Sequence, residues 1–317
     1  MKKNIFLFIA LTSGYVTAME ETKTHLLVIP GQNGMGGQNV DKVLPYFARN
    51  NLRHFIPTPL QKPDFGQTNC LTFLSDEIGL LKYYSTIKDN DHIILHGSSQ
   101  GTATTINYAA HNPDNIKALI LESVMLTGNS AIFHTVDNMM IPEQCDLPES
   151  SYYTLPYVAK SSFPNYAPTG EQPINNIDNL PTDLPIIILH DTKDFQLSFK
   201  DAQALYAYLT EVKHNNNVYL FAQESPKGKH INLLTIDDME EICAIETILR
   251  LHNLLPFNHN QIVVDLKKYQ PAVQQEWLDH FEAMHNKEQN LECVDSSLKT
   301  TGISAALYAA GKWLGIV

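Results

Sequence analysis

Short apolar runs that alternate with segments of helical periodicity constrain the fold of this chain more than any other feature. Each run holds only a few residues, which suits a strand and is too short for a buried helix. A strand without polar alternation is buried on both faces, as happens when helices cover both sides of a parallel sheet. The runs lie at 25–30, 92–96, 117–122, 185–190 and 218–222, with a weaker one at 54–57. The sequence therefore predicts an α/β fold with a mostly parallel sheet and helices on both faces.

The intervals between the apolar runs predict the helices that cover this sheet. Apolar residues recur at helical spacing over residues 71–87, and a second helix is expected over residues 99–111. Ser198 and Asp201 form an S-x-x-D capping pattern, which predicts a helix that opens there and continues to about residue 212.

Length and composition favour one domain. The chain has 317 residues, of which 44% are hydrophobic and 18% charged, as in ordinary globular proteins. A chain of this length buries enough apolar surface for a continuous core. We predict a single domain over residues 19–317, with a helical extension from about residue 237 and a final helix over residues 301–317.

Residues 123–184 interrupt the alternation of strands and helices. Proline fixes φ and removes a backbone donor, so prolines this dense predict a segment without long regular elements. Because such a long loop is uncommon in a compact domain unless it has a role, we interpret it as an insertion packed over one edge of the sheet, as a cap or lid. The alternative is a surface excursion without contact to the site. The segment contains Pro142, Pro148, Pro156, Pro164, Pro168, Pro173, Pro181, Tyr152, Tyr153, Tyr157 and Tyr166.

The first 18 residues have the pattern of a signal peptide. Lys2 and Lys3 precede an apolar run over residues 5–11, and the residues from Val16 to Ala18 offer a cleavage site of small side chains. This pattern predicts export to a periplasm or to the outside of the cell. The apolar run is far shorter than the roughly 20 residues of a spanning helix, so no permanent membrane anchor is expected. A buried N-terminal strand is the alternative.

The charge distribution argues against nucleic acid as a partner. The formal net charge is −12 with histidines neutral, and the basic residues form no runs. Nucleic acid and anionic membrane surfaces both attract proteins through positive patches, which this sequence does not predict.

The four cysteines leave two interpretations open. In an exported chain, Cys70, Cys145, Cys243 and Cys293 permit two disulfides with three possible pairings. Free buried thiols are the alternative. Their wide spacing does not resemble a metal-binding pair, so no metal site is expected.

The strongest chemical signal is the segment Gly97-x-Ser99-x-Gly101, between a predicted strand and a predicted helix. A serine on a sharp strand-to-helix turn has a strained backbone, and its neighbours must lack Cβ atoms to avoid collision. The first N–H groups of the following helix would face an anion that forms beside Ser99. The pattern predicts a serine nucleophile; a flexible Gly-Ser turn is the alternative.

The strand, the turn with Ser99 and the helix resemble the α/β-hydrolase superfamily, whose order of parts the chain follows over about residues 24–234. In that family an acid follows a later strand. The resemblance implies Asp194 as this acid, in a segment similar to the family's HGxxD pattern. The segment departs from the pattern because Asp191 replaces the glycine, which makes Asp191 a rival acid. Glu122, at the end of the preceding strand, is a further alternative.

The resemblance also implies the base and the oxyanion donors. His230, in the loop after the last strand, takes the place of the general base. The donors are the backbone N–H of Gln100 and one N–H from the glycine-rich turn at 31–37, from Gln32 or its neighbour Asn33. That turn lacks the Lys-Ser/Thr ending of a phosphate loop and the GxGxxG spacing of a dinucleotide site.

These residues together predict a serine hydrolase without a metal or organic cofactor. Ser99 would attack a carbonyl carbon, His230 would take its proton, and Asp194 would orient the imidazole. A carboxylic ester, of a small molecule or a lipid, is the first substrate class, because tyrosines of the 123–184 insertion could line an acyl pocket. A serine peptidase or amidase with the same triad is the alternative enzyme. A non-catalytic binding protein on a hydrolase scaffold is the alternative from another class.

Overall fold

A computed structural model describes residues 24–29, 53–55, 91–114, 116–140, 147–162, 170–230, 238–256 and 264–301. Its centre is a six-stranded sheet in which every neighbouring pair of strands is parallel. The strands are β1 (Thr24–Ile29), β2 (Arg53–Phe55), β3 (His92–Ser98), β4 (Ile116–Glu122), β5 (Ile186–Asp191) and β6 (Val218–Gln223). All six apolar runs of the sequence are therefore confirmed as strands.

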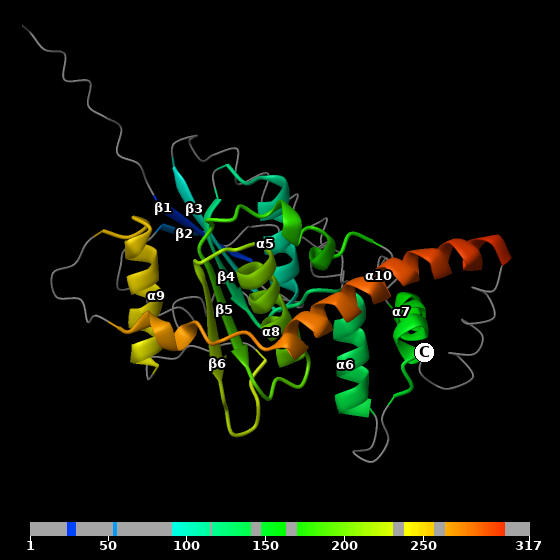
Figure 1. Cartoon of the computed structure of the whole chain (residues 1–317). Coiled ribbons are helices and arrows are strands. Elements are labelled where there is room, and N and C mark those ends of the chain that lie inside the picture. The colour runs from blue at the N-terminus through cyan, green and yellow to red at the C-terminus, as the bar shows by residue number, and fades with distance from the viewer. Residues whose placement is uncertain are drawn as a thin grey trace, which may run out of the picture.

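Helices cover both faces of this sheet, as the sequence predicts (Figure 1). In Figure 1, α9 lies on one side of the strands, and α5 and α8 lie on the other. The helices are α5 (Gln100–His111), α6 (Gly128–Met140), α7 (Ser151–Ser162), α8 (Phe199–Ala207) with a π-helical continuation (Tyr208–Val212), α9 (Met239–Leu251) and α10 (Gln275–Thr301). The helices predicted over 71–87 and 301–317 lie outside the described residues, apart from Thr301, where α10 ends.

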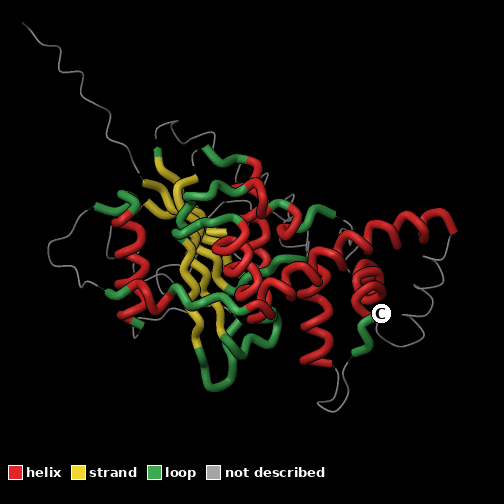
Figure 2. Tube along the Cα trace, viewed as in Figure 1, coloured by secondary structure: helices red, strands yellow, loops and turns green. Residues whose placement is uncertain are grey.

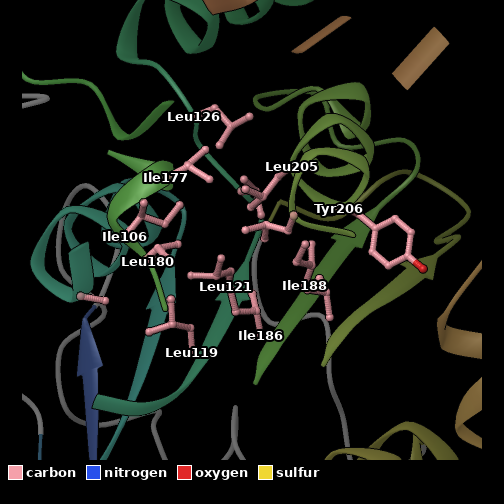
Figure 3. Packing of buried hydrophobic residues seen from close by; sticks show 14 of the residues in the cluster. Ile106, Leu119, Leu121, Leu126, Ile177, Leu180, Ile186, Ile188, Leu205 and Tyr206 are labelled. Carbon is pink, nitrogen blue, oxygen red and sulfur yellow. The ribbon is translucent and has the colours of Figure 1, made fainter. Parts of the chain in front are cut away.

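The strands divide their side chains between two apolar layers, because successive residues of a strand point to opposite faces. Leu26 and Val28 of β1 pack in the layer beneath α9, whereas Leu27 and Ile29 pack in the layer beneath α5, α8 and α10. Figure 2 shows the strands as the middle layer between helices. Figure 3 shows the second layer, which includes Leu121 of β4, Ile188 of β5 and Leu205 of α8. Both faces being buried explains why these strands lack polar alternation.

The strand order reverses at one position along the carboxyl edge of the sheet. The order is β2-β1-β3-β4-β5-β6. β2 therefore lies on one side of β1, and the later strands β3 to β6 extend the sheet on the other side. Open α/β sheets bind ligands at the carboxyl ends of the strands where the order reverses in this way. Ser99 follows β3 directly and therefore lies at this reversal.

The predicted start of α8 is confirmed, but only half of its capping pattern is present. Ser198 is the N-cap, and its side chain accepts a hydrogen bond from the Lys200 N–H. Asp201 contributes differently: its buried carboxylate accepts hydrogen bonds from Ser130 of α6 and His280 of α10. Asp201 therefore joins three helices instead of completing a cap.

The insertion at 123–184 contains two helices, so the prediction that it lacks long regular elements is wrong. α6 has 13 residues and α7 has 12, and Pro156 lies inside α7. Most of the prolines fall outside the two helices and thus do not interrupt them, and Pro173 occupies the first turn of a 3₁₀ helix (Pro173–Asn175), where a missing N–H costs nothing. The function of this insertion as a cap or lid stays a prediction.

Among the four cysteine side chains, the structure describes that of Cys243. Cys243 is a free, buried thiol in α9, so the four cysteines do not form two disulfides. Cys70, Cys145 and the predicted signal peptide lie outside the described residues, as does the side chain of Cys293. Within the described ranges, no helix combines the length and the apolar character that a bilayer span requires.

A buried glutamate connects α10 to the insertion. Over the residues of α10 up to Leu291, whose side chains the structure describes, the buried positions are Trp277, Phe281, Met284, Glu288 and Leu291. A carboxylate thus occupies one place in this apolar stripe. Tyr152 of α7 donates a hydrogen bond of 2.6 Å to Glu288 Oε1, and Asn129 of α6 donates one of 2.6 Å to Oε2. Burial and the neighbouring carboxylate raise the pKa of the Tyr152 phenol, which keeps it protonated as a donor. Glu288 thus holds both helices of the insertion against α10.

Replacing this carboxylate should loosen the insertion. We expect Glu288→Leu to lower the free energy of unfolding by about 3 kcal/mol, because it leaves the Tyr152 hydroxyl and the Asn129 amide buried without their acceptor. Urea denaturation measures the change. The matched control is Glu282→Leu on the exposed side of α10, which should stay within about 0.5 kcal/mol of the parent. Equal effects of the two substitutions would contradict the account.

The contact of β3 with α5 leaves no room for a side chain at Gly97. A Cβ atom there would lie 2.4 Å from the Gly101 carbonyl oxygen and 2.4 Å from Thr105 Oγ1. The first of these atoms belongs to the helix backbone and cannot move aside by a rotamer change. Gly97 is therefore required for the close approach of α5 to the end of β3.

Adding one methyl group at this contact should be costly. We expect Gly97→Ala to destabilise the protein by about 3 kcal/mol, because the backbone of α5 must shift to admit it. Removing the Thr105 side chain should not rescue the variant, so Gly97→Ala/Thr105→Ala should remain well below Thr105→Ala alone in urea denaturation. Full rescue by Thr105→Ala would show that the helix backbone is not the obstacle.

Candidate functional site

Ser99 occupies the turn between β3 and α5 in a strained conformation. Its φ is +54° and its ψ is −123°, a region that non-glycine residues rarely adopt. The Ser99 N–H donates to the Glu122 carbonyl oxygen at 2.8 Å, and the Ser99 carbonyl accepts from Thr102 N at 2.9 Å and Thr102 Oγ1 at 2.6 Å. Hydrogen bonds therefore hold both the N–H and the carbonyl of this strained residue. The predicted sharp turn is present.

The structure brings Ser99, His230 and Asp194 together in one hydrogen-bonded chain. His230 Nε2 lies 2.7 Å from Ser99 Oγ, and His230 Nδ1 lies 2.9 Å from Asp194 Oδ2. The three residues follow β3, β6 and β5, whose carboxyl ends meet at the same edge of the sheet. An imidazole between a hydroxyl and a carboxylate can accept a proton from the hydroxyl while the carboxylate stabilises the resulting positive charge.

Backbone groups fix the Asp194 carboxylate in this arrangement. Asp194 Oδ1 accepts hydrogen bonds from the N–H groups of Gln196 at 2.8 Å and Leu197 at 3.1 Å. Burial alone would raise the pKa of Asp194, but the hydrogen bond and charge of His230 and the hydrogen bond from the Gln196 N–H lower it by more. The net pKa lies below the ordinary value, so Asp194 is ionised at neutral pH.

Asp191, the rival acid, has a different position and different partners. It is fully buried at the end of β5, where its Oδ1 accepts from the Lys193 N–H at 2.8 Å. Its Oδ2 accepts from the N–H groups of Ser225 and Lys229, each at 3.1 Å. Asp191 therefore ties the loop that carries Asp194 to the loop that carries His230, and the histidine pairs with Asp194.

Glu122, the further alternative, lies beside Ser99 at the end of the neighbouring strand β4. Its buried carboxylate accepts a hydrogen bond of 2.6 Å from Ser98 Oγ and lies 3.6 Å from His96 Nε2. Its backbone carbonyl accepts the Ser99 N–H. Glu122 thus supports the turn at Ser99 from the neighbouring strand.

Gly228 allows the two loops to approach each other. Its φ is +70°, and a Cβ atom there would lie 2.1 Å from the Lys193 carbonyl oxygen. A side chain at this position would separate the loop of His230 from the loop of Asp194. The exposed ion pair between Lys193 Nζ and Glu224 joins the same loops at 2.6 Å.

Two further residues at the site have no part in the sequence prediction. Ser123, which follows β4 with a φ of +53°, donates a hydrogen bond from its hydroxyl to the His230 carbonyl oxygen. His190 lies fully buried in β5 with its Nε2 3.6 Å from Asp194 Oδ2. The position of His190 at the start of the HGxxD-like segment is a signal that could have identified it. Ser123 carries no comparable pattern.

Of the predicted oxyanion donors, Gln100 lies within the described residues. It is the first residue of α5, next to Ser99, so the N-terminal end of this helix lies at the Ser99 side chain. Gln32 and the alternative Asn33 lie outside the described residues. The N-terminus of a helix favours negative charge, so this position suits a developing oxyanion.

Part of the insertion lies against the site. His134 Nε2 of α6 is 3.3 Å from the Asp194 carbonyl oxygen, and Thr135 of the same helix donates to the Gln196 carbonyl at 3.2 Å. Phe195, between these two residues of the acid loop, is 40% exposed, and its ring centroid lies 6.5 Å from that of His230. The surface beside the histidine is thus apolar at this point.

Within the described ranges, no group of three or more His, Cys, Asp or Glu residues is arranged to hold a metal ion.

Comparison with known proteins gives matches among solved structures only. No protein-family model and no curated protein matches the chain. An esterase from Pyrococcus furiosus aligns with a TM-score of 0.50 at 13% identity, over 73% of this chain and 81% of its own. Est1E from Butyrivibrio proteoclasticus has a TM-score of 0.44 at 14% identity, over 74% and 90% of the two chains. Mouse alpha/beta hydrolase domain-containing protein 10 has a TM-score of 0.41 at 16% identity, over 72% and 90%.

At these identities structural likeness speaks to the fold and not to the activity. The TM-score of 0.50 with the Pyrococcus furiosus esterase indicates a shared fold, and the strand-turn-helix around Ser99 is part of the α/β-hydrolase architecture. The chain therefore has the α/β-hydrolase fold.

Proposed function

We propose that the protein is a serine hydrolase that cleaves carboxylic esters through an acyl-enzyme on Ser99. One observation carries this proposal: the continuous hydrogen-bonded chain from Ser99 Oγ through His230 to Asp194, with contacts of 2.7 and 2.9 Å. A candidate nucleophile within hydrogen-bond reach of a base, which a third group orients, is the arrangement that activates a hydroxyl.

The proposed reaction follows from the roles of the three side chains. Ser99 Oγ attacks the carbonyl carbon while His230 Nε2 takes the hydroxyl proton, and Asp194 stabilises the imidazolium that results. The imidazolium then donates this proton to the leaving alcohol as the C–O bond breaks. Water next attacks the acyl-enzyme with His230 again as base, which releases the acid and restores Ser99.

The oxyanion of each tetrahedral intermediate would receive backbone N–H groups. We assign one to Gln100 at the start of α5 and the other to Gln32 in the glycine-rich turn after β1. The helix N-terminus favours this negative charge, and one such donor typically contributes about 3 kcal/mol to the stability of the transition state.

The surroundings of His230 favour an ester with an apolar group. The partly exposed ring of Phe195 lies beside the imidazole and offers apolar contact to a substrate. A peptidase or amidase that uses the same triad remains the alternative activity. The complete hydrogen-bonded chain argues against a binding protein that has lost turnover, since such a protein has no need to keep all three groups in contact.

The first test compares esters with amides. We expect hydrolysis of p-nitrophenyl esters, with kcat/KM rising over short to medium acyl chains as apolar contact grows, and a far lower rate on aminoacyl p-nitroanilides. Ser99→Ala should lower the ester rate by at least about 10⁴-fold, because the hydroxyl that forms the acyl-enzyme is absent. A faster rate on the amides would favour the peptidase, and an unchanged rate in Ser99→Ala would contradict the proposed nucleophile.

A second test separates the two aspartates. We expect Asp194→Asn to lower kcat by about 10⁴-fold, since an amide holds the wrong tautomer of His230. Asp191→Asn should instead lower stability by about 1–3 kcal/mol, because Asp191 accepts backbone N–H groups from both loops. Its kcat, normalised to titrated active sites, should fall by less than about tenfold. The reverse ranking of the two kcat values would make Asp191 the catalytic acid.

A further inference from the structure

A second imidazole lies beneath the triad, and the proposed reaction gives it no chemical step. His190 is the fifth residue of β5 and is fully buried, with its ring edge-to-face against Phe199 of α8 at 5.8 Å between centroids. Its Nε2 lies 3.6 Å from Asp194 Oδ2, the same oxygen that accepts from His230. A titratable group so near the triad carboxylate must affect how that carboxylate is held.

The hydrogen bonds of His190 define its tautomer. The Val124 N–H donates to His190 Nδ1 at 3.1 Å, so Nδ1 carries a lone pair and no proton. A neutral imidazole then has its proton on Nε2, which lies 3.2 Å from the Leu197 carbonyl oxygen and donates to it. Burial lowers the pKa of His190 and outweighs the opposing effects of Asp194 and the Leu197 carbonyl. The ring is thus neutral at neutral pH.

The bond to Leu197 closes the loop that carries Asp194. This loop leaves β5 at Asp191 and returns to the ring at Leu197. The Leu197 carbonyl oxygen accepts a hydrogen bond from His190 Nε2, and the Leu197 N–H donates to Asp194 Oδ1. Loss of the Nε2 donor would release the Leu197 carbonyl and, with it, one of the groups that set the direction of the Asp194 carboxylate.

We propose that His190 is a positioning residue of the triad: its neutral, Nε2-protonated imidazole keeps the 191–197 loop closed so that Asp194 faces His230. This inference rests on the proposed catalytic roles of Ser99, His230 and Asp194. His190 acts through Asp194 and does not touch the substrate.

The neutral state of His190 is part of this role. During the reaction a positive charge forms on His230, and the Asp194 carboxylate at 2.9 Å stabilises it. A cation on His190 would compete for the same carboxylate oxygen and would oppose the charge on His230. The Val124 N–H disfavours this cation. If Nδ1 were protonated, its N–H would point at the Val124 N–H, and two donors would face each other without an acceptor.

Three substitutions separate the two hydrogen bonds of the ring. His190→Gln places an amide N–H donor near the position of Nε2, His190→Asn places an amide oxygen near Nδ1, and His190→Phe keeps only the ring. We expect His190→Gln to retain kcat within about threefold. His190→Asn and His190→Phe should lower kcat by about 100-fold, the scale of a small misplacement of a catalytic group, with KM within about twofold. Each kcat is normalised to active sites titrated with a fluorophosphonate.

His25 offers a matched control at the opposite edge of the sheet. It is also a buried histidine in a contact with an aspartate, since its Nε2 lies 2.9 Å from Asp91 Oδ2. It belongs to the amino end of β1, away from the carboxyl ends that carry the triad. His25→Asn should lower the melting temperature without changing the normalised kcat. If His190→Asn and His25→Asn change stability and kcat alike, the effect of His190 is structural and the proposal is overturned.

A readout without substrate keeps this inference distinct from the proposed activity. Long-range ¹H–¹⁵N correlation of the parent protein at pH 7 should show His190 protonated on Nε2 alone. The low-field proton between His230 Nδ1 and Asp194 should persist in His190→Gln and disappear in His190→Asn. Protonation of His190 on Nδ1, or a low-field proton unchanged in His190→Asn, would overturn the inference even if a variant folds poorly. A parent protein that neither labels with fluorophosphonate nor cleaves esters would instead contradict the proposed function.

Discussion

The strained backbone of Ser99 depends on the packing of β3 against α5, and the geometry of the site depends on that strain. A φ of +54° at a serine costs on the order of 1–3 kcal/mol, which the surrounding contacts must offset. Glu122 accepts the Ser99 N–H, Thr102 holds the Ser99 carbonyl, and the absence of a side chain at Gly97 lets the helix approach. The hydroxyl is thereby fixed at the carboxyl edge of the sheet, where it meets the loops from β5 and β6.

Those two loops act as one unit because buried polar groups connect them. Asp191 accepts N–H groups from both, and Gly228 packs on the Lys193 carbonyl with no room for a Cβ atom. His190 closes the loop of Asp194 from below. Asp194 and His230 are therefore positioned relative to each other by contacts that do not involve Ser99, which is the preorganisation that the proposed catalysis requires.

The sequence was informative where the signal is local. The strands and the turn at Ser99 follow from apolar runs and one short motif, and the structure agrees with them. Asp194 and His230 follow from the resemblance to the α/β-hydrolase superfamily, and the structure places both beside Ser99. The resemblance implied Asp194 as the acid but left Asp191 as a rival, since both carboxylates follow one strand and the partners that distinguish them lie more than 30 residues away. The role of Glu288 could not be predicted from the sequence either, because its partners Tyr152 and Asn129 are 136 and 159 residues away along the chain. The helices of the insertion were not predicted, because the number of prolines suggested an irregular segment. Most of these prolines lie outside the two helices, where they do not interrupt a helix.

Ser99 as the nucleophile is the central claim, and covalent labelling tests it most directly. A fluorophosphonate should react with the folded protein in a one-to-one ratio, and peptide mass spectrometry should place the adduct on Ser99 alone. The adduct should be absent from Ser99→Ala and from protein denatured before labelling, because only the folded site brings His230 within 2.7 Å of the hydroxyl. An adduct on another residue, or equal labelling of Ser99→Ala, would contradict the account.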